Sequence, residues 1–126
     1  QECSNYENLI KKNSIDLQIL GLGINGHIGY NESGSNFNRK TRLVSLDKTT
    51  IKSKNLSKSF PKKALTMGIR TILKGKKIIL LASGKSKAKA VKHLLKDKPN
   101  KNWPVTALKK HKNFIIIVDK KASSLL

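Results

Sequence analysis

Two uninterrupted apolar runs, residues 78–81 and 114–118, most constrain how this chain can fold. Runs of this length without polar alternation are typical of strands covered on both faces, as in a parallel sheet. Residues 17–20 (Leu-Gln-Ile-Leu) predict a third strand, and the alternating residues 42–46 predict a fourth at a sheet edge. The chain is therefore expected to be built around a mostly parallel sheet.

Helical patterns lie before and between these runs. The opening residues, 63–74 and 86–95 each place apolar side chains three or four positions apart, as on one face of a helix. Strands that alternate with helices predict an α/β domain, Rossmann-like, with helices on both sides of the sheet in three layers. Residues 1–126 suit one such domain. The periodic residues are Tyr6, Leu9 and Ile10, then Leu65, Ile69, Ile72 and Leu73, then Ala88, Val91 and Leu95.

The glycine-rich segment after the first strand has two interpretations. Gly21, Gly23 and Gly26 match the spelling of a dinucleotide-binding fingerprint, and Asp47 lies where a ribose-binding acid belongs. That site requires a helix that begins inside the motif and faces the pyrophosphate. Residues 27–38 are instead rich in Gly, Asn and Ser and have no helical periodicity. We therefore favour a loop over a nucleotide site.

His27 and Glu32 on this loop are the candidate acid–base residues. A carboxylate that folds back onto an imidazole fixes its tautomer and prepares it for proton transfer near neutral pH, and Asn25 could orient the same ring from its other side. The loops after parallel strands open at one sheet edge, so this loop, residues 83–87 and Asp119 are expected to share a cleft. The alternative is structural, with a packed histidine and a turn-stabilising glutamate.

Residues 83–87 (Ser-Gly-Lys-Ser-Lys) follow a strand and open a helix. Backbone N–H groups and a lysine ammonium at such a turn suit a phosphate. The alternative is an ordinary strand-to-helix turn in a lysine-rich protein.

The net charge of +20, from 27 Lys and Arg against 7 Asp and Glu, raises the question of a polyanionic partner. Nucleic acid is disfavoured, because nearly all the basic residues are lysine and only 5% of residues are aromatic; compositional drift is the favoured explanation. One cysteine, Cys3, excludes an internal disulfide and gives no metal site. No run is long enough to span a membrane and no signal peptide is evident, so a soluble cytoplasmic protein is expected.

Residues 21–32 (Gly-Leu-Gly-Ile-Asn-Gly-His-Ile-Gly-Tyr-Asn-Glu) resemble the active-site motif of glucosamine-6-phosphate deaminases. The sister 6-phosphogluconolactonases share the first part of this motif but continue with a Phe-Pro element in place of residues 30–32. Further segments agree in order and spacing, so that the resemblance covers essentially the whole chain. These segments are residues 2–7, 41–42, 61–68, 84–88 and 104–108.

The resemblance implies that glucosamine 6-phosphate is isomerised and deaminated to fructose 6-phosphate and ammonia, a step of amino-sugar catabolism, without a metal or organic cofactor. It implies that His27 is the ring-opening acid–base, that Glu32 is its partner and that Asn25 tunes it. Lys87 matches a lysine that contacts the substrate phosphate. A homo-oligomer is a further expectation.

The resemblance also marks a lid and a regulatory site. Residues 42–71 correspond to the mobile lid, in which Lys58 is the candidate replacement for a phosphate-binding arginine that residues 53–60 lack. Ser35 and Arg42 match part of a site for the activator N-acetylglucosamine 6-phosphate, although Val44 replaces a lysine found there.

The chain corresponds to the carboxyl-terminal half of such an enzyme. The amino-terminal half of the family carries a phosphate loop and the aspartate that abstracts the C2 proton. We therefore expect an incomplete sheet and an isolated chain without measurable activity. Two other functions stay open: a lactonase-like hydrolase of sugar phosphates, and a basic anion-binding fragment without catalysis.

Overall fold

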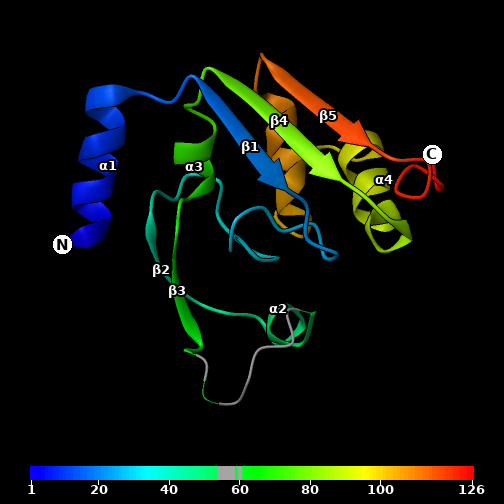
Figure 1. The fold of residues 1–126 in the computed structure, drawn as a ribbon, viewed down its shortest axis with the longest axis horizontal. Coiled ribbons are helices and arrows are strands. Elements are labelled where there is room, and N and C mark those ends of the chain that lie inside the picture. Colours follow the sequence, from blue (N-terminus) through cyan, green and yellow to red (C-terminus); the bar gives the residue numbers. More distant parts are fainter. Residues whose placement is uncertain (54–58, 60) are drawn as a thin grey trace.

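Three parallel strands form the centre of the computed structural model, which describes residues 1–53, 59 and 61–126 (Figure 1). The strands are β1 (Leu17–Gly21), β4 (Lys77–Ala82) and β5 (Phe114–Val118), in the order β1-β4-β5. In register, Leu20 lies opposite Leu80, which in turn lies opposite Ile116. The two apolar runs and residues 17–20 are thus confirmed as strands of one parallel sheet, and the α/β class is confirmed with them.

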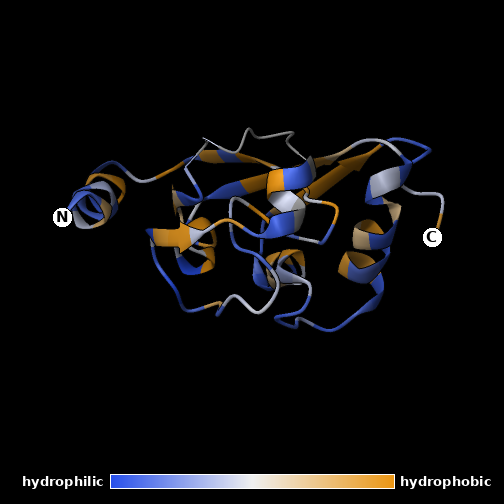
Figure 2. Ribbon diagram, turned by 90° about the horizontal axis from the view of Figure 1, so that it is seen from below, coloured by the Kyte–Doolittle hydropathy of each residue, from blue (hydrophilic) through white to orange (hydrophobic). Residues whose placement is uncertain are grey.

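Helices connect the strands and cover one side of the sheet (Figure 2). The helix α4 (Ala88–Lys96) follows a short 3₁₀ turn, η1 (Lys85–Lys87), and a second 3₁₀ helix, η2 (Pro104–Lys110), leads back towards β5. The helix predicted over residues 86–95 is therefore confirmed, but its buried stripe includes Leu94 in place of the predicted Leu95, which is exposed.

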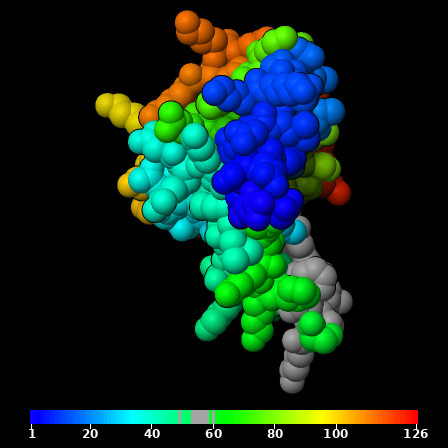
Figure 3. Space-filling view, turned by 90° about the vertical axis from the view of Figure 1, so that its left-hand side faces the viewer, coloured from blue at the N-terminus to red at the C-terminus, as the bar shows by residue number. Residues whose placement is uncertain are grey.

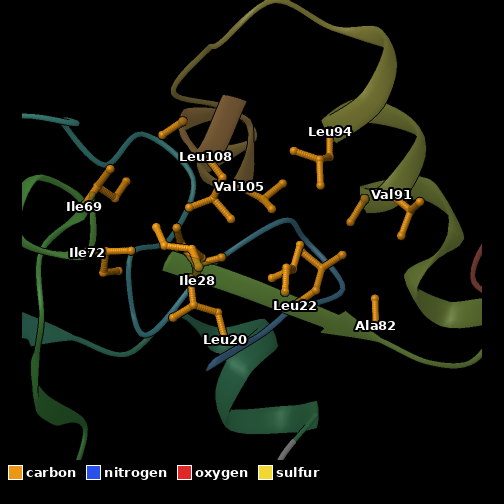
Figure 4. Packing of buried hydrophobic residues seen from close by; sticks show 14 of the residues in the cluster. Leu20, Leu22, Ile28, Ile69, Ile72, Ala82, Val91, Leu94, Val105 and Leu108 are labelled. Carbon is orange, nitrogen blue, oxygen red and sulfur yellow. The ribbon is translucent and has the colours of Figure 1, made fainter. Parts of the chain in front are cut away.

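The core lies between the sheet and these helices (Figure 4). Leu20 and Leu80 of the sheet belong to one buried cluster with Val91 of α4 and with Val105 and Leu108 of η2. Burying an aliphatic side chain of this size contributes about 1.5–3 kcal/mol. The loop after β1 belongs to the same core through Leu22 and Ile28, which are both buried. The loop that carries the candidate residues is consequently anchored to the hydrophobic core.

The prediction of one helix over residues 63–74 is wrong. Residues 63–66 form the strand β3 (Lys63–Thr66), which pairs antiparallel with β2 (Arg42–Ser45), and only α3 (Ile69–Ile72) is helical. Apolar residues four apart fit a strand followed by a helix as well as one long helix, and the partner strand decides between them. Gly68 lies between the two elements. The position requires glycine, because a Cβ there would lie 2.2 Å from the carbonyl oxygen of Arg39.

The two-stranded ribbon of β2 and β3 also corrects a second expectation. The strand predicted over residues 42–46 exists, but it lies outside the parallel sheet and not at its edge. The ribbon projects from the body of the molecule (Figure 3), and the short helix α2 (Lys48–Ser53) follows β2.

The other side of the parallel sheet presents apolar side chains to solvent. Ile19 in β1 is 62% exposed and Ile117 in β5 is 54% exposed, whereas the alternate residues Leu20, Ile78 and Leu80 are buried. Parallel sheets are normally covered on both faces. Within this chain the expectation that both faces of the strands are covered is therefore not met, whereas the expectation of an incomplete layer arrangement is.

The amino-terminal helix α1 (Glu2–Asn13) is confirmed but stands beside the sheet, and none of its residues is buried (Figure 1). Tyr6 and Leu9, on its apolar face, are exposed. Its attachment is polar: the Glu7 carboxylate accepts hydrogen bonds from the Thr41 backbone N–H at 2.9 Å and from the hydroxyls of Thr41 and Thr71 at 2.6 and 2.5 Å. One carboxylate thus joins α1, the start of the ribbon and α3.

Candidate active site

The loop after β1 is held by tight turns and contains no helix between residues 22 and 38, all of which the structure describes. Gly23 N–H donates to the His27 carbonyl at 2.9 Å, and Gly26 N–H donates to the Gly23 carbonyl at 2.9 Å. Gly26 has a φ of 79°, a value that side chains rarely tolerate. The dinucleotide interpretation fails, since no helix begins within residues 22–38, where the motif would need one.

Two glycines of this loop leave room for rings. A Cβ at Gly23 would lie 2.3 Å from the Nδ1 and Cε1 atoms of His27, so the imidazole rests directly on the Gly23 backbone. A Cβ at Gly26 would lie 2.6 Å from the ring of Trp103, the only tryptophan. The ring of Trp103 also stacks on His93 of α4, with the ring centroids 3.9 Å apart. The glycine spacing therefore serves ring packing.

His27, Asn25 and Glu32 form one hydrogen-bonded cluster. The His27 Nδ1 atom lies 2.6 Å from the Asn25 Oδ1 and 3.2 Å from the Glu32 Oε2, and the Asn25 amide donates to the same Glu32 oxygen at 2.8 Å. Two oxygens at Nδ1 require its proton, so the neutral ring carries its lone pair on Nε2. The sequence prediction that these three residues lie together is confirmed, but Asn25 contacts the same ring nitrogen as Glu32 and not the other side of the ring. An acid–base role for the three residues stays a prediction.

Glu32 is held in its ionised form. Burial alone would raise its pKa, but hydrogen bonds from His27, Thr50 and Asn25 outweigh burial and lower the pKa to about 2. Glu32 is therefore a carboxylate at neutral pH and a fixed acceptor for His27. Thr50 is a site residue that sequence reasoning missed, because its role depends on a contact between α2 and the loop that no local pattern signals.

A cavity of about 590 Å³ opens beside His27. Its wall joins the loop after β1 to the turn after β4, which contributes Lys87. Burial lowers the pKa of Lys87, and no acidic partner for it is found among the described residues. The expected convergence of these two loops is thus confirmed, and a cation is available for an anionic ligand. The lining residues are Gly21, Leu22, Gly23, Ile24, His27, Gly29, Ser86 and Lys87.

Asp119 does not line this cavity, contrary to the expected convergence of all three loops. Its carboxylate accepts hydrogen bonds from the Ser83 hydroxyl at 2.7 Å, the Gly84 N–H at 3.0 Å and the Ala122 N–H at 2.7 Å. Asp119 therefore fixes the turn after β4, and it occupies one backbone donor that a phosphate could have used.

Arg42 and Ser35 lie outside the lining of the cavity beside His27. The Arg42 Nη1 donates at 2.9 Å to the Oδ1 of buried Asn31, whose own amide donates to the carbonyls of Ile28 and Met67. Ser35 closes a turn by donating its N–H to the Glu32 carbonyl at 3.0 Å. Neither residue lines the cavity with His27, and Lys58 lies outside the described residues.

The described residues hold no group of three or more His, Cys, Asp or Glu side chains that could bind a metal ion. Of the helices in that same part of the chain, none combines the length and apolar composition that a membrane crossing requires.

Known proteins resemble this chain along nearly all of it. A sequence profile of the family described as glucosamine-6-phosphate isomerases/6-phosphogluconolactonase matches residues 1–117. A glucosamine-6-phosphate deaminase of Mycoplasma mycoides subsp. mycoides is 48% identical over 128 residues, which cover 96% of this chain and 52% of that protein. A glucosamine-6-phosphate deaminase of Clostridium novyi is 48% identical over 131 residues, covering 100% of this chain and 54% of the relative.

Solved structures agree with these relatives. A monomeric glucosamine-6-phosphate deaminase gives a TM-score of 0.95 at 45% identity, over 99% of this chain and 54% of that structure. A 6-phosphogluconolactonase from Trypanosoma brucei shares the fold, with a TM-score of 0.74 at 21% identity over 98% of this chain and 52% of that structure. The chain spans about half the length of the curated relatives it matches.

Proposed function

The chain belongs to the family of glucosamine-6-phosphate isomerases and 6-phosphogluconolactonases, and we propose that it supplies the ring-opening and phosphate-binding side of a glucosamine-6-phosphate deaminase site. The observation that carries this proposal is the His27–Asn25–Glu32 cluster at the edge of a cavity that also contains Lys87. The names of the relatives that are 45–48% identical favour the same activity.

The cluster suits the first chemical step. With its Nδ1 proton held by Asn25 and Glu32, His27 has Nε2 available to accept a proton from the anomeric hydroxyl of glucosamine 6-phosphate. As that O–H bond breaks, the C1 carbonyl forms, the bond from C1 to the ring oxygen breaks, and the histidine returns the proton to that oxygen. The protein thereby opens the sugar without net consumption of a proton.

The later steps need a second base. A proton must move from C2 to C1, and water must then replace the amino group at C2 to release ammonia and leave fructose 6-phosphate. The family resemblance assigns the C2 base to the amino-terminal half, which the matched region does not include. Among the described acids, Glu32 is committed to His27 and Asp119 to its turn, so we propose that the isolated chain catalyses no measurable deamination.

Lys87 is the proposed contact for the substrate phosphate. It lines the cavity together with the loop after β1, is half-buried, and has a pKa lowered by burial of its ammonium, with no carboxylate partner among the described residues. A bound phosphate would relieve that cost. Residues 42–71 are the proposed lid, and Ser35 with Arg42 the proposed remnant of a regulatory site. A cytoplasmic role in amino-sugar catabolism follows from the same activity.

A chimera tests the proposal. The amino-terminal half of the Clostridium novyi relative is joined to residues 1–126, and ammonia release from glucosamine 6-phosphate is measured beside hydrolysis of 6-phosphogluconolactone. We expect deamination, lowered about 10²- to 10⁴-fold in kcat by His27→Gln with little change in KM, and none from residues 1–126 alone. A folded chimera that hydrolyses the lactone but releases no ammonia would refute the assignment.

The lactonase alternative rests on fold neighbours of about 20% identity and has no support from residues 30–32. The anion-binding alternative rests on the net charge of +20. A salt titration of binding to DNA and RNA tests it, since contacts to phosphates in a nucleic acid require a steep dependence on salt.

A further inference from the structure

Both oxygens of the Glu32 carboxylate are engaged, and by different parts of the chain. The Oε2 atom faces the His27 Nδ1 at 3.2 Å and accepts from the Asn25 amide at 2.8 Å, both within the loop after β1. The Oε1 atom accepts a hydrogen bond from the Thr50 hydroxyl, which lies in α2. The orientation of the carboxylate therefore depends on α2 as well as on its own loop.

Thr50 is well placed for this task. It is 1% exposed although α2 is a helix of only six residues. At the start of the helix, the Ile51 backbone N–H donates a hydrogen bond to the Asp47 carbonyl at 3.0 Å. A buried hydroxyl that donates to a carboxylate makes one of the stronger hydrogen bonds available to a neutral side chain.

We propose that Thr50 is a positioning residue for His27, acting through Glu32, and that it couples α2 to the acid–base group of the proposed deaminase site. The proposal rests on the proposed function for its catalytic consequence but not for its structural one. With Oε1 fixed, Oε2 is aimed at Nδ1 and the imidazole keeps its lone pair on Nε2. Without the Thr50 hydroxyl, Oε1 would be left short of a buried donor and the carboxylate would turn.

The charge state of Glu32 is consistent with this role. Among the described residues, the titratable group that acts on it is His27, and Asn25 and Thr50 contribute neutral donors that favour the ionised carboxyl. Removing the donor from α2 should therefore raise the pKa of Glu32. A ligand that displaces α2 and so breaks the hydrogen bond from Thr50 should also raise the pKa of Glu32.

The first test uses residues 1–126 labelled with ¹³C at the glutamate carboxyls and ¹⁵N in the histidine rings. The chain has only three glutamates, Glu2, Glu7 and Glu32, so Glu32→Gln assigns the signal. Thr50→Val removes the hydroxyl and keeps the shape; we expect the proton affinity of Glu32 to increase about tenfold and the His27 ring to lose its single tautomer. Thr50→Ser should restore both, and Lys52→Ala on the exposed side of α2 should change neither.

The second test uses the chimera, in which Thr50→Val should lower kcat about tenfold with KM nearly unchanged, and Thr50→Ser should restore it. Unchanged Glu32 and His27 signals in a folded Thr50→Val chain would overturn the proposal. If that variant does not fold, the wild-type hydroxyl proton decides: a slowly exchanging Thr50 signal close to Glu32 supports the proposal, and its absence overturns it. An inactive chimera with the expected signals would count against the proposed function alone.

Discussion

At the scale of single residues, the position of the His27 ring depends on the absence of a side chain at Gly23. The His27 ring rests on the Gly23 backbone, where a methyl group would lie 2.3 Å from two ring atoms. The histidine cannot keep both that position and its hydrogen bonds to Asn25 and Glu32 if the space is filled. Gly21, in the same motif, has no atom within 4 Å of an added Cβ and provides a matched control.

Gly23→Ala should therefore displace His27 while the core stays intact. We expect a loss of about 10²-fold in kcat of the chimera, the size expected for a misplaced catalytic group. The His27 ¹⁵N signals of residues 1–126 should shift with it. Gly21→Ala should leave those signals in place; equal effects of both substitutions would show that ring packing on Gly23 is unimportant.

Lys87 gives a prediction of a different kind. A phosphate contact exists in both the bound substrate and the transition state, so Lys87→Ala should mainly raise KM, about tenfold, and change kcat little. Lys85 is exposed on the same turn and does not line the cavity, which makes Lys85→Ala the control. A fall in kcat with KM unchanged would place Lys87 in the chemistry instead.

At the scale of elements, one carboxylate holds α1 in place. Burial raises the pKa of Glu7, but hydrogen bonds from Thr41 and Thr71 outweigh that effect and leave the pKa below its ordinary value. A group with a depressed folded pKa stabilises the fold fully above its unfolded pKa, and the stabilisation is lost as pH falls towards the folded value. The attachment of α1 should consequently weaken in acid.

Glu7→Gln tests this. At about pH 7 we expect a loss of about 1 kcal/mol in the free energy of unfolding, because charge-assisted hydrogen bonds become neutral ones. Between about pH 5 and pH 3 the wild-type chain should lose stability and the difference from the variant should shrink. Urea titrations at both ends of this range measure it, and a difference that does not change with pH would show that the Glu7 carboxylate is not stabilised by folding.

The elements also show what the sequence could and could not predict. The strands at residues 78–81 and 114–118 were predictable because strands of a parallel sheet are typically uninterrupted apolar runs, and residues 17–20 depart from that pattern only at Gln18. The strand β3 was not, because the choice between strand and helix at Leu65 depends on pairing with β2. His27, Glu32 and Asn25 lie within eight residues on one loop and could be found from their motif, whereas Thr50 reaches Glu32 from another element.

At the scale of the whole molecule, the uncovered side of the sheet dominates. The side chains of Leu17, Ile19, Leu81, Ile115 and Ile117 are at least 41% exposed there. A patch of this kind, with β1 pairing on one side only, favours association. In relatives twice as long, further chain is available to cover it.

Residues 1–126 alone should therefore associate as concentration rises. Ile19→Lys, on the exposed face of β1, should reduce association without loss of the fold, while Leu20→Lys, on the buried face, should unfold the chain. Sedimentation velocity measures the first effect and circular dichroism the second. Purely monomeric wild-type chain at high concentration would show that the exposed face is not adhesive.

The packing of Trp103 against Gly26 and His93 makes Trp103 an intrinsic fluorescent probe of the site. Because Trp103 is the only tryptophan of the chain, all tryptophan fluorescence comes from a side chain that packs against the loop carrying His27. Protonation of the His93 imidazole, which stacks on the indole, should quench that fluorescence. A ligand that moves the backbone at Gly26 should shift the wavelength of maximum emission. Occupancy of the cavity can thus be followed without a label or a coupled enzyme, even in a chain that turns over nothing.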